Sequence, residues 1–339
     1  FVDMNQSRTL AGKVVAIASL ENKPRHQEKL ESEIKIHRAL TDGIYGDTGV
    51  QVVSLESVFR DNHAYYLLMH KCAHGTLGDL MDARKRLTEP EARYLIEELI
   101  KGVQYIHSKS VIHRDLKLGN LFLTGAHADD TPYSPDKQGR NRMHLRIGDF
   151  GLAVQLRREG EKRASLCGTP NYLAPETLCT HIDMRKERFE ESARLGGSSP
   201  PTVDRETLAL VDGLGCALKR GHDYSVDTWA IGVVMHTLLH GTPPFEGPSV
   251  GATYKNILSN NKTHPAEAPV SPEAGDLIDR LLTPSPEDRI TLADALQHPW
   301  FTSCPTSPLT CLPESSLSSI PSYATPAHVS YMEGVMEAE

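Results

Sequence analysis

The chain has 339 residues, of which 39% are hydrophobic and 24% are charged, an ordinary composition that argues against a collagen-like, disordered or membrane-embedded protein. It carries 44 acidic and 36 basic residues and a formal net charge of −8, which argues against tight binding to nucleic acid or to an anionic membrane. The six cysteines show no C-x-x-C spacing, so neither a zinc site nor a disulfide framework is predicted, and a reducing compartment is favoured.

The hydropathy pattern gives no sign of a membrane anchor or a leader sequence. No apolar stretch approaches the roughly 18 residues that a membrane-spanning helix needs. The chain starts at Phe1 rather than methionine, and no short apolar run follows a basic start. We therefore expect a fragment of a longer protein, folded as one large two-lobed domain or as two smaller ones.

The first part of the chain is rich in strand patterns. Residues 10–17, with several Val, Ile and Ala, predict a short strand, and residues 24–40 predict a charged amphipathic helix. Residues 52–59 and 64–69 predict two further strands, separated by Asp and Asn residues that favour a turn. A β-hairpin is therefore expected after the helix.

The pattern becomes helical after residue 75. Thr88 and Glu91 form a T-x-x-E capping box ahead of an apolar stripe that ends at Ile106, and this predicts the most clearly marked helix of the chain. Residues 224–239 are apolar on nearly every side, so we expect a helix buried in the domain centre. Further helices joined by prolines are predicted up to Phe301.

Three stretches depart from this order. Residues 125–142 are polar and contain breakers of both helix and strand, so they predict an extended loop. Residues 180–220 mix charge runs with Gly, Ser and Pro. We interpret them as a flexible insertion, with a short helix over residues 208–218 as the alternative. Residues 302–339 are rich in Ser and Pro and predict a linker or tail.

Three motifs follow the capped helix in a fixed order. Residues 113–120 read H-R-D-L-K-L-G-N, residues 149–151 read D-F-G after a short predicted strand, and residues 174–176 read A-P-E. D-F-G alone would be weak evidence, but the three motifs in this order and at this spacing match the catalytic loop and the activation segment of protein kinases. The chain therefore resembles the protein kinases, in which the activation segment runs from D-F-G to A-P-E.

The resemblance implies transfer of the γ-phosphoryl group of ATP with Mg²⁺ as the second cofactor, a reaction that depends on positioning and charge neutralisation. By this resemblance Asp115 is the base for the substrate hydroxyl, and Lys117 lies near the transferred group. Asn120 and Asp149 are the expected Mg²⁺ ligands within the ATP site. The competing interpretation is a charged surface loop, against which the number of matching positions argues.

The cation that contacts ATP is expected on the first strand. Lys13 occupies the position at which the family has a lysine on the α and β phosphates, and Glu33 on the following helix is its expected partner. A strand lysine alone would be an ordinary solvated residue, and Glu28 and Glu31 are neighbouring alternatives to Glu33. The later motifs favour the pair Lys13 and Glu33.

The adenine site and the phosphate loop show departures from the family. Met69 and Cys72 bound the segment that aligns with the hinge, where the family usually has an acidic residue in place of His70. Because the hinge backbone holds most of the adenine, we expect this change to be tolerated. The 12 residues before Lys13 contain no G-x-G-x-x-G, so we expect the family's first strand and glycine-rich loop to be absent and ATP binding to be weakened.

A more specific resemblance is to the polo-like kinases. It is carried by L-T-E-P-E-A-R-Y over residues 87–94, H-R-D-L-K-L-G-N-L-F-L over 113–123 and L-C-G-T-P-N-Y over 166–172. It covers roughly residues 11–301 and implies a mitotic serine/threonine kinase of the nucleus and cytoplasm, with the spindle pole or centrosome as a finer location. The implied partners are protein substrates with acidic residues near the target, and no nucleic acid or membrane.

The same resemblance implies a regulatory site and an anchor in the activation segment. Ser165 stands where polo-like kinases carry an activating phosphorylation site, and the basic residues Lys162 and Arg163 precede it for recognition by an upstream activating kinase. The phosphate would pair with Arg114 and order the segment.

Glu176, at the end of A-P-E, is expected to be structural. The resemblance pairs it with Arg289 in P-E-D-R-I-T, and this pair would anchor the substrate-binding segment.

These patterns predict an α+β fold, the bilobal protein-kinase fold, with a small antiparallel sheet lobe that carries one helix and a larger, mainly helical lobe. The predicted boundaries are 1–72 for the incomplete small lobe and hinge, 73–301 for the large lobe with insertions at 125–142 and 180–220, and 302–339 for the tail.

Two other functions compete with catalysis. A pseudokinase scaffold would be consistent with the missing glycine-rich loop and the insertions, and such a loop in the upstream sequence would favour catalysis instead. A small-molecule kinase is disfavoured, because an activation segment ending in A-P-E serves peptide substrates.

Overall fold

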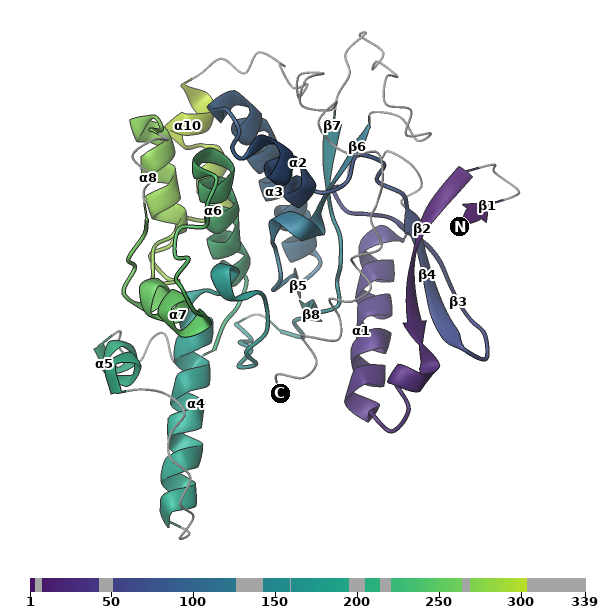
Figure 1. Ribbon diagram of the computed structural model, residues 1–339, viewed down its shortest axis with the longest axis horizontal. Coiled ribbons are helices and arrows are strands. Elements are labelled where there is room, and N and C mark those ends of the chain that lie inside the picture. Colours follow the sequence, from purple (N-terminus) through teal and green to yellow (C-terminus); the bar gives the residue numbers. More distant parts are fainter. Residues whose placement is uncertain are drawn as a thin grey trace.

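The computed structural model consists of two lobes: a small one with a sheet and one long helix, and a larger, mainly helical one (Figure 1). The structure describes residues 1–3, 8–42, 51–125, 143–158, 160–194, 205–213, 221–263 and 269–303. The predicted α+β bilobal architecture is confirmed. None of the helices in these ranges is long and apolar enough to cross a membrane.

The small lobe is built on an antiparallel sheet in the order β1-β2-β4-β3. Its strands are β1 (Val2–Asp3), β2 (Arg8–Ala16), β3 (Leu55–Arg60) and β4 (Ala64–His70). The predicted hairpin of β3 and β4 is confirmed, although β3 begins three residues later than expected. The strand β1 was not predicted, because two residues are too few to show a period.

Helix α1 (Pro24–Thr41) joins the two lobes. Near its start, Leu30 packs in a small cluster with Leu20 and Leu67, which belongs to the sheet. Near its end, Ile36 and Leu40 are part of the core of the large lobe. The predicted helix is confirmed, and the residues in its middle turns lie where the two cores meet.

The large lobe is centred on α3 (Glu89–Ser108) and α6 (Ser225–His240), which pack against each other. Glu91 accepts hydrogen bonds from the Thr88 amide and hydroxyl, so its part of the predicted capping box is present. Every residue of α6 after Ser225 is buried, which confirms the predicted central helix. The other helices are α2 (Leu77–Arg84), α4 (Pro175–Arg194), α5 (Arg205–Gly213), α7 (Val250–Leu258), α8 (Pro272–Leu281), α9 (Leu292–Leu296) and α10 (Pro299–Thr302).

Two short antiparallel ladders frame the segment between α3 and the activation segment. Strand β5 (Val111–Ile112) pairs with β8 (Val154–Gln155), and β6 (Leu121–Gly125) pairs with β7 (Met143–Ile147). The H-R-D motif follows β5, and the D-F-G motif follows β7 after one glycine. Because Leu121 pairs with Ile147, the end of the H-R-D-L-K-L-G-N motif lies beside the start of the D-F-G motif.

The interpretation of residues 180–220 as a flexible insertion is wrong for the part that the structure describes. Helix α4 continues to Arg194, and α5 covers Arg205–Gly213, close to the alternative helix at 208–218. Ile182 and Val211 are buried, and the two helices pack against each other. The charge runs belong to a helix, because burial of a few apolar residues stabilises helices that composition alone does not reveal.

The remaining parts of that stretch, residues 195–204 and 214–220, lie outside the described residues. So do residues 126–142 of the predicted loop and residues 304–339 of the predicted tail.

Candidate active site

A cation and two carboxylates meet where the lobes join. The Lys13 Nζ lies 2.7 Å from Glu33 Oε1 and 3.2 Å from Asp149 Oδ1. Burial alone would lower the pKa of Lys13, but the two carboxylates raise it above its usual value, so this side chain is a fixed cation. The structure therefore brings together two residues of the small lobe and one of the large lobe that the sequence singled out.

Asp149 is an ionised carboxylate in a strained backbone position. Burial alone would raise its pKa, but the charge and hydrogen bond of Lys13 hold it below the usual value. Its φ of 59° lies in the left-handed region that non-glycine residues rarely adopt, and such strain gathers at functional sites. The side chain is 39% exposed, so a ligand in the cleft can reach it.

A further carboxylate, that of Asp115, lies in a polar cluster of the H-R-D loop. Lys117 Nζ is 2.8 Å from Asp115 Oδ2, and the Asn120 amide donates to Asp115 Oδ2 at 3.1 Å and to the Asp115 carbonyl at 2.8 Å. Thr169 donates to Asp115 Oδ1 at 2.8 Å and accepts from Lys117 at 3.0 Å. Thr169 thus joins the activation segment to the candidate base.

The backbone links the two carboxylate-bearing motifs directly. The Gly148 amide, next to Asp149, donates to the carbonyl of Asn120 at 3.0 Å. The ring of Phe150 lies between His113 and His37, with ring centroids 5.2 and 4.8 Å away. Asp149 and Asn120 are therefore close neighbours, although 29 positions separate them in the sequence.

A buried aspartate sets the conformation of the H-R-D loop. Asp227, on α6, accepts hydrogen bonds from the backbone amides of His113 and Arg114, each at 2.9 Å. Its Oδ2 also lies 2.9 Å from His107 Nε2. Burial alone would raise the pKa of Asp227, but the His107 hydrogen bond and charge and the other partners hold it low. Arg114 has a φ of 66°, and these bonds offset the strain of that conformation.

The side chains of Asn120 and Asp149 suit a hard divalent cation. The Asn120 amide nitrogen already donates to Asp115, which leaves its oxygen as the remaining acceptor. Amide and carboxylate oxygens are the ligands that Mg²⁺ prefers, and it usually takes one or two from the protein and the rest from phosphates and water. Among the described residues, no group of three or more His, Cys, Asp or Glu side chains is arranged to hold a metal ion.

The predicted hinge residues lie at and just after the end of β4, the strand between β2 and β3. Met69 pairs with Ala11 on β2 and with Leu55 on β3, and the His70 amide donates to Ser54 at 2.9 Å. Cys72 follows the strand and is half-buried. None of these contacts involves the unusual His70 side chain, so the substitution leaves this backbone pairing intact.

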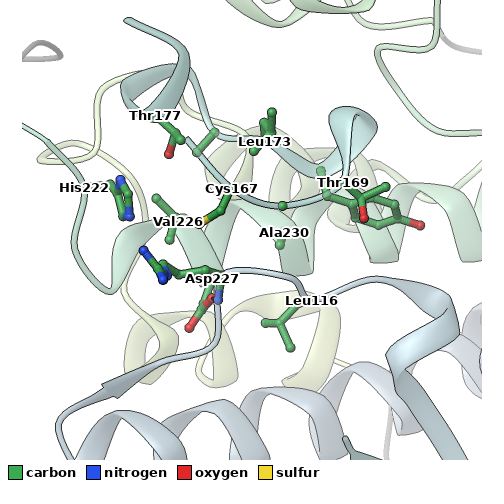
Figure 2. A pocket seen from close by; sticks show the side chains of 13 residues that line it. Leu116, Cys167, Thr169, Leu173, Thr177, His222, Val226, Asp227 and Ala230 are labelled. Atoms are coloured by element: carbon green, nitrogen blue, oxygen red, sulfur yellow. The ribbon is translucent and has the colours of Figure 1, made fainter. Parts of the chain in front are cut away.

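Arg114 contacts the activation segment at two points. Its Nε donates to the Leu152 carbonyl and its Nη1 donates to the Ser165 hydroxyl, both at 2.8 Å. A small cavity nearby is lined by Arg114, Cys167, His222 and Asp227 among others (Figure 2). Burial raises the pKa of the Cys167 thiol, so this group is not an activated nucleophile.

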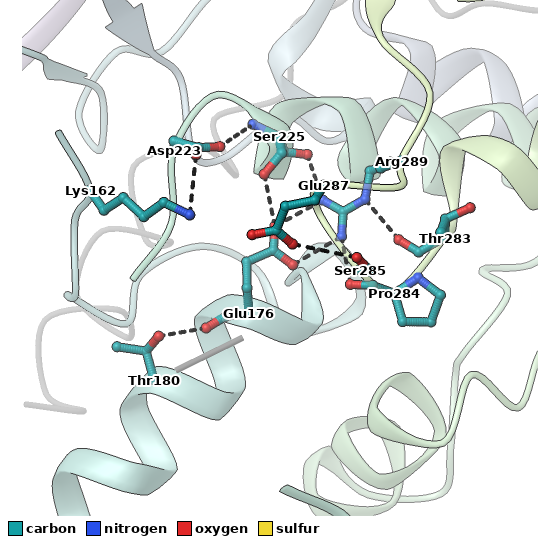
Figure 3. Close-up of polar contacts among 10 residues, drawn as sticks. All are labelled: Lys162, Glu176, Thr180, Asp223, Ser225, Thr283, Pro284, Ser285, Glu287 and Arg289. Atoms are coloured by element: carbon teal, nitrogen blue, oxygen red, sulfur yellow. Dashed lines mark hydrogen bonds and ion pairs between the residues drawn. The ribbon is translucent and has the colours of Figure 1, made fainter. Parts of the chain in front are cut away.

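Glu176 and Arg289 form a buried ion pair (Figure 3). The guanidinium donates to both carboxylate oxygens, at 2.8 and 3.0 Å, and each side chain is 1% exposed. Arg289 also donates to the carbonyls of Thr283, Pro284 and Ser225. The contact ties the end of the activation segment to the loop before α9.

Sequence reasoning missed three residues of this site as participants. Thr169 was noted only as part of a motif, and Asp227 and His37 were not noted. Asp227 had a detectable signal, because a carboxylate within a helix that is apolar on all sides needs partners when buried. His37 lies on the buried side of a helix with a mostly charged sequence and gave no comparable signal.

Comparisons with known proteins agree with this geometry. The protein kinase domain matches residues 2–190 and 216–301. The chain is 37% identical to a probable serine/threonine-protein kinase, CCRP1, of Zea mays and 35% identical to the serine/threonine-protein kinase PLK1 of Xenopus laevis, each over 93% of the chain. It is 33% identical over 90% of its length to the cell cycle serine/threonine-protein kinase CDC5/MSD2 of Saccharomyces cerevisiae. The matched regions cover 41%, 43% and 35% of these relatives, so the chain spans less than half of each.

Proposed function

Since this chain belongs to the protein kinase family, we propose that it transfers the γ-phosphoryl group of ATP to serine or threonine hydroxyls of proteins. The observation that carries the proposal is that Asp115, Asn120 and Asp149 of the large lobe lie together, and that Lys13 of the small lobe contacts Asp149. A base, two oxygen ligands for a metal and a cation for phosphates are the groups that phosphoryl transfer requires.

Each residue of the cluster has a distinct task in this proposal. Asp115 accepts the proton of the attacking hydroxyl, while Thr169 and Lys117 hold its two oxygens in place. Lys13, oriented by Glu33, binds the α and β phosphates of ATP. Asn120 and Asp149 would hold Mg²⁺, which when bound neutralises the charge that develops on the phosphates.

The finer assignments rest on similarity to the polo-like kinases. Relatives named PLK1 and CDC5/MSD2 support a role in the cell cycle, and the second carries that role in its name. We propose protein substrates with acidic residues near the target hydroxyl and a location in the nucleus and cytoplasm, including the spindle pole or centrosome. An inactive scaffold is not favoured, because Lys13, Asp115 and Asp149 are each present and in contact with a partner.

Regulation through Ser165 belongs to the same proposal. An upstream kinase would phosphorylate this hydroxyl, and Arg114, which already donates to it, would pair with the phosphate. Ser165→Ala should then lower turnover well below that of the phosphorylated wild type. Equal turnover of the two proteins would rule out this regulatory role.

Radiolabelled phosphate transfer to an acidic serine peptide tests the catalytic proposal. Asp149→Asn should abolish Mg²⁺-dependent transfer, because an amide is a poor replacement for the charged metal ligand. Asp61→Asn is the matched control: this exposed carboxylate accepts bonds from the β3–β4 turn and from the Tyr66 hydroxyl and contacts none of the proposed catalytic residues, so transfer should be unchanged. Retained turnover in Asp149→Asn would contradict the metal role, and a wild-type protein that binds ATP without transfer would favour the scaffold.

A further inference from the structure

Residues 191–215 form an excursion that the match to the protein kinase domain leaves out. The family match stops at residue 190 and resumes at residue 216, so the end of α4 and all of α5 fall in the gap. The described part is nevertheless integrated into the fold: Val211 on α5 belongs to the main core, and α5 packs against both α4 and α7. Helix α7 in turn packs against η3 (Pro170–Tyr172) in the activation segment.

A threonine hydroxyl joins the chain before the excursion to the chain after it. Thr180, on α4, accepts a hydrogen bond from the Gly221 amide at 3.1 Å. Thr180 also donates to the Glu176 carbonyl at 2.8 Å (Figure 3). Thr180 is buried, so water competes little with these bonds. This hydroxyl therefore fixes the segments on the two sides of the excursion to each other, next to the Glu176 anchor.

The residues that follow this closure hold the activation segment. The strap, residues 221–223, pairs with Arg163 by two backbone hydrogen bonds: the His222 amide donates to Arg163 at 2.7 Å, and the Arg163 amide donates to His222 at 2.8 Å. Lys162 Nζ lies 3.5 Å from Asp223 Oδ2. The strap therefore binds the activation segment at Lys162 and Arg163, just before Ser165.

The approach of strap and segment is too close for a side chain at Gly221. Its φ is +88°, and a Cβ there would lie 2.6 Å from the Arg163 carbonyl oxygen. Next to it, His222 is 2% exposed and lines the cavity that also contains Arg114 and Cys167 (Figure 2). Burial, and then the charge of Arg114, lower the pKa of His222 to about 4, so a neutral ring sits beside the guanidinium.

We propose that Thr180 is a positioning residue for peptide phosphorylation, acting through the strap. Its hydroxyl fixes Gly221, and the strap then fixes Lys162 and Arg163. The segment that follows carries Ser165 and Thr169, and Thr169 contacts the proposed base Asp115. The excursion is thereby fastened to the activation segment, which a bare loop of the same length would leave unsupported. This inference rests on the proposed kinase function.

Hydrogen exchange and steady-state kinetics on the full chain test the inference together. Thr180→Val keeps the shape but removes the acceptor, so exchange of the Gly221, His222 and Arg163 amides should rise about tenfold, the effect of losing one hydrogen bond. The KM for an acidic serine peptide should rise by a similar factor of about 5 to 10, with kcat and the KM for ATP within about twofold of wild type.

Two further variants separate positioning from general stability. Thr180→Ser retains the hydroxyl and should restore both exchange and peptide KM. Thr237→Val removes a buried hydroxyl that donates only to the Val233 carbonyl within α6, so it should leave strap exchange and peptide KM unchanged. Gly221→Ala should raise both quantities more than Thr180→Val does, because the added methyl clashes with Arg163.

The outcomes discriminate cleanly. Unchanged exchange at Arg163 in Thr180→Val overturns the inference, and so does faster exchange with an unchanged peptide KM. A wild-type protein that transfers no phosphate overturns the proposed function instead, and that failure is recognised separately because exchange is measured without substrate.

Discussion

The two lobes differ in how firmly they hold their share of the active site. The small lobe holds Lys13 on a sheet whose own cluster of buried side chains is Leu20, Leu30 and Leu67 among the described residues. The large lobe holds Asp115 and Asn120 next to a continuous core that extends from α1 to α10. Asp227 fixes their loop through the amides of His113 and Arg114. Regions with few buried contacts open more easily, so in the proposed function the base stands on the firmer lobe and the lysine for the α and β phosphates on the softer one.

The strongest test of this contrast is a change in the large lobe that touches only chemistry. Asp115→Asn should lower kcat by about 10²- to 10⁴-fold, the usual contribution of a general base, while the KM for ATP stays within about twofold. Rapid-quench or steady-state assays measure both. A rise in the KM for ATP with little loss of kcat would break the proposed division between the lobes.

The next effect concerns the buried ion pair of the large lobe. Arg289→Met leaves the Glu176 carboxylate buried and unpaired, which should lower the free energy of unfolding by about 3–5 kcal/mol. Urea unfolding followed by circular dichroism measures the loss. The double variant with Glu176→Gln should recover part of it, and a double variant as unstable as Arg289→Met would contradict this account.

Lys13→Met supplies the small-lobe counterpart and sharpens the comparison. We expect a smaller loss of stability than in Arg289→Met, because the pair faces the cleft, and burial already raises the pKa of Glu33 so that it can take up a proton. The main effect should instead be a higher KM for ATP. Equal losses of stability would show that the small-lobe pair is as firmly integrated as the large-lobe one.

A pH titration of stability should detect a buried histidine at the lobe junction. Burial, opposed in part by the hydrogen bond with Val53, lowers the pKa of His37 from 6.5 to about 4. The unfolded chain therefore binds more protons between pH 6.5 and 4, and stability is lost as the pH falls through that window, by up to roughly 3 kcal/mol. His37→Gln should flatten this slope. An unchanged slope would assign it to other groups, of which the similarly buried His222 is the first to examine.

The smallest effects concern the two long helices that carry or precede site residues. The residue before α1, Lys23, provides no side-chain cap. The residue before α3, Thr88, forms a hydrogen bond with Glu91. Thr88→Ala should cost about 1 kcal/mol in urea unfolding, and Lys23→Ser should add about 0.5 kcal/mol by supplying a cap. No change in either variant would show that tertiary packing alone determines both ends.

Much of the fold was predictable because local patterns and tertiary structure agree. The capping box at Thr88, the all-apolar stripe of α6 and the turn residues between β3 and β4 each indicated the element that is observed. The pair of Lys13 and Glu33 was expected from the family resemblance, whereas the contact of Lys13 with Asp149 was not. The continuation of α4 was missed and α5 was only the alternative, because charge runs and glycines hide a few apolar residues that become buried only through packing. Asp227 was missed because its partners, His113 and Arg114, lie more than a hundred positions away.

The bond between Glu176 and Arg289 also has a consequence for how the protein is made. The two residues are 113 positions apart, so at a translation rate of about 5–20 residues per second Glu176 emerges roughly 6 to 23 s before its partner is synthesised. During that interval the ribosome-bound chain already carries every residue proposed above to contact the nucleotide, but the end of its activation segment has no counter-ion. Termination between Glu176 and Arg289 would therefore release a product that contains all three motifs and lacks the ion pair that fastens the activation segment.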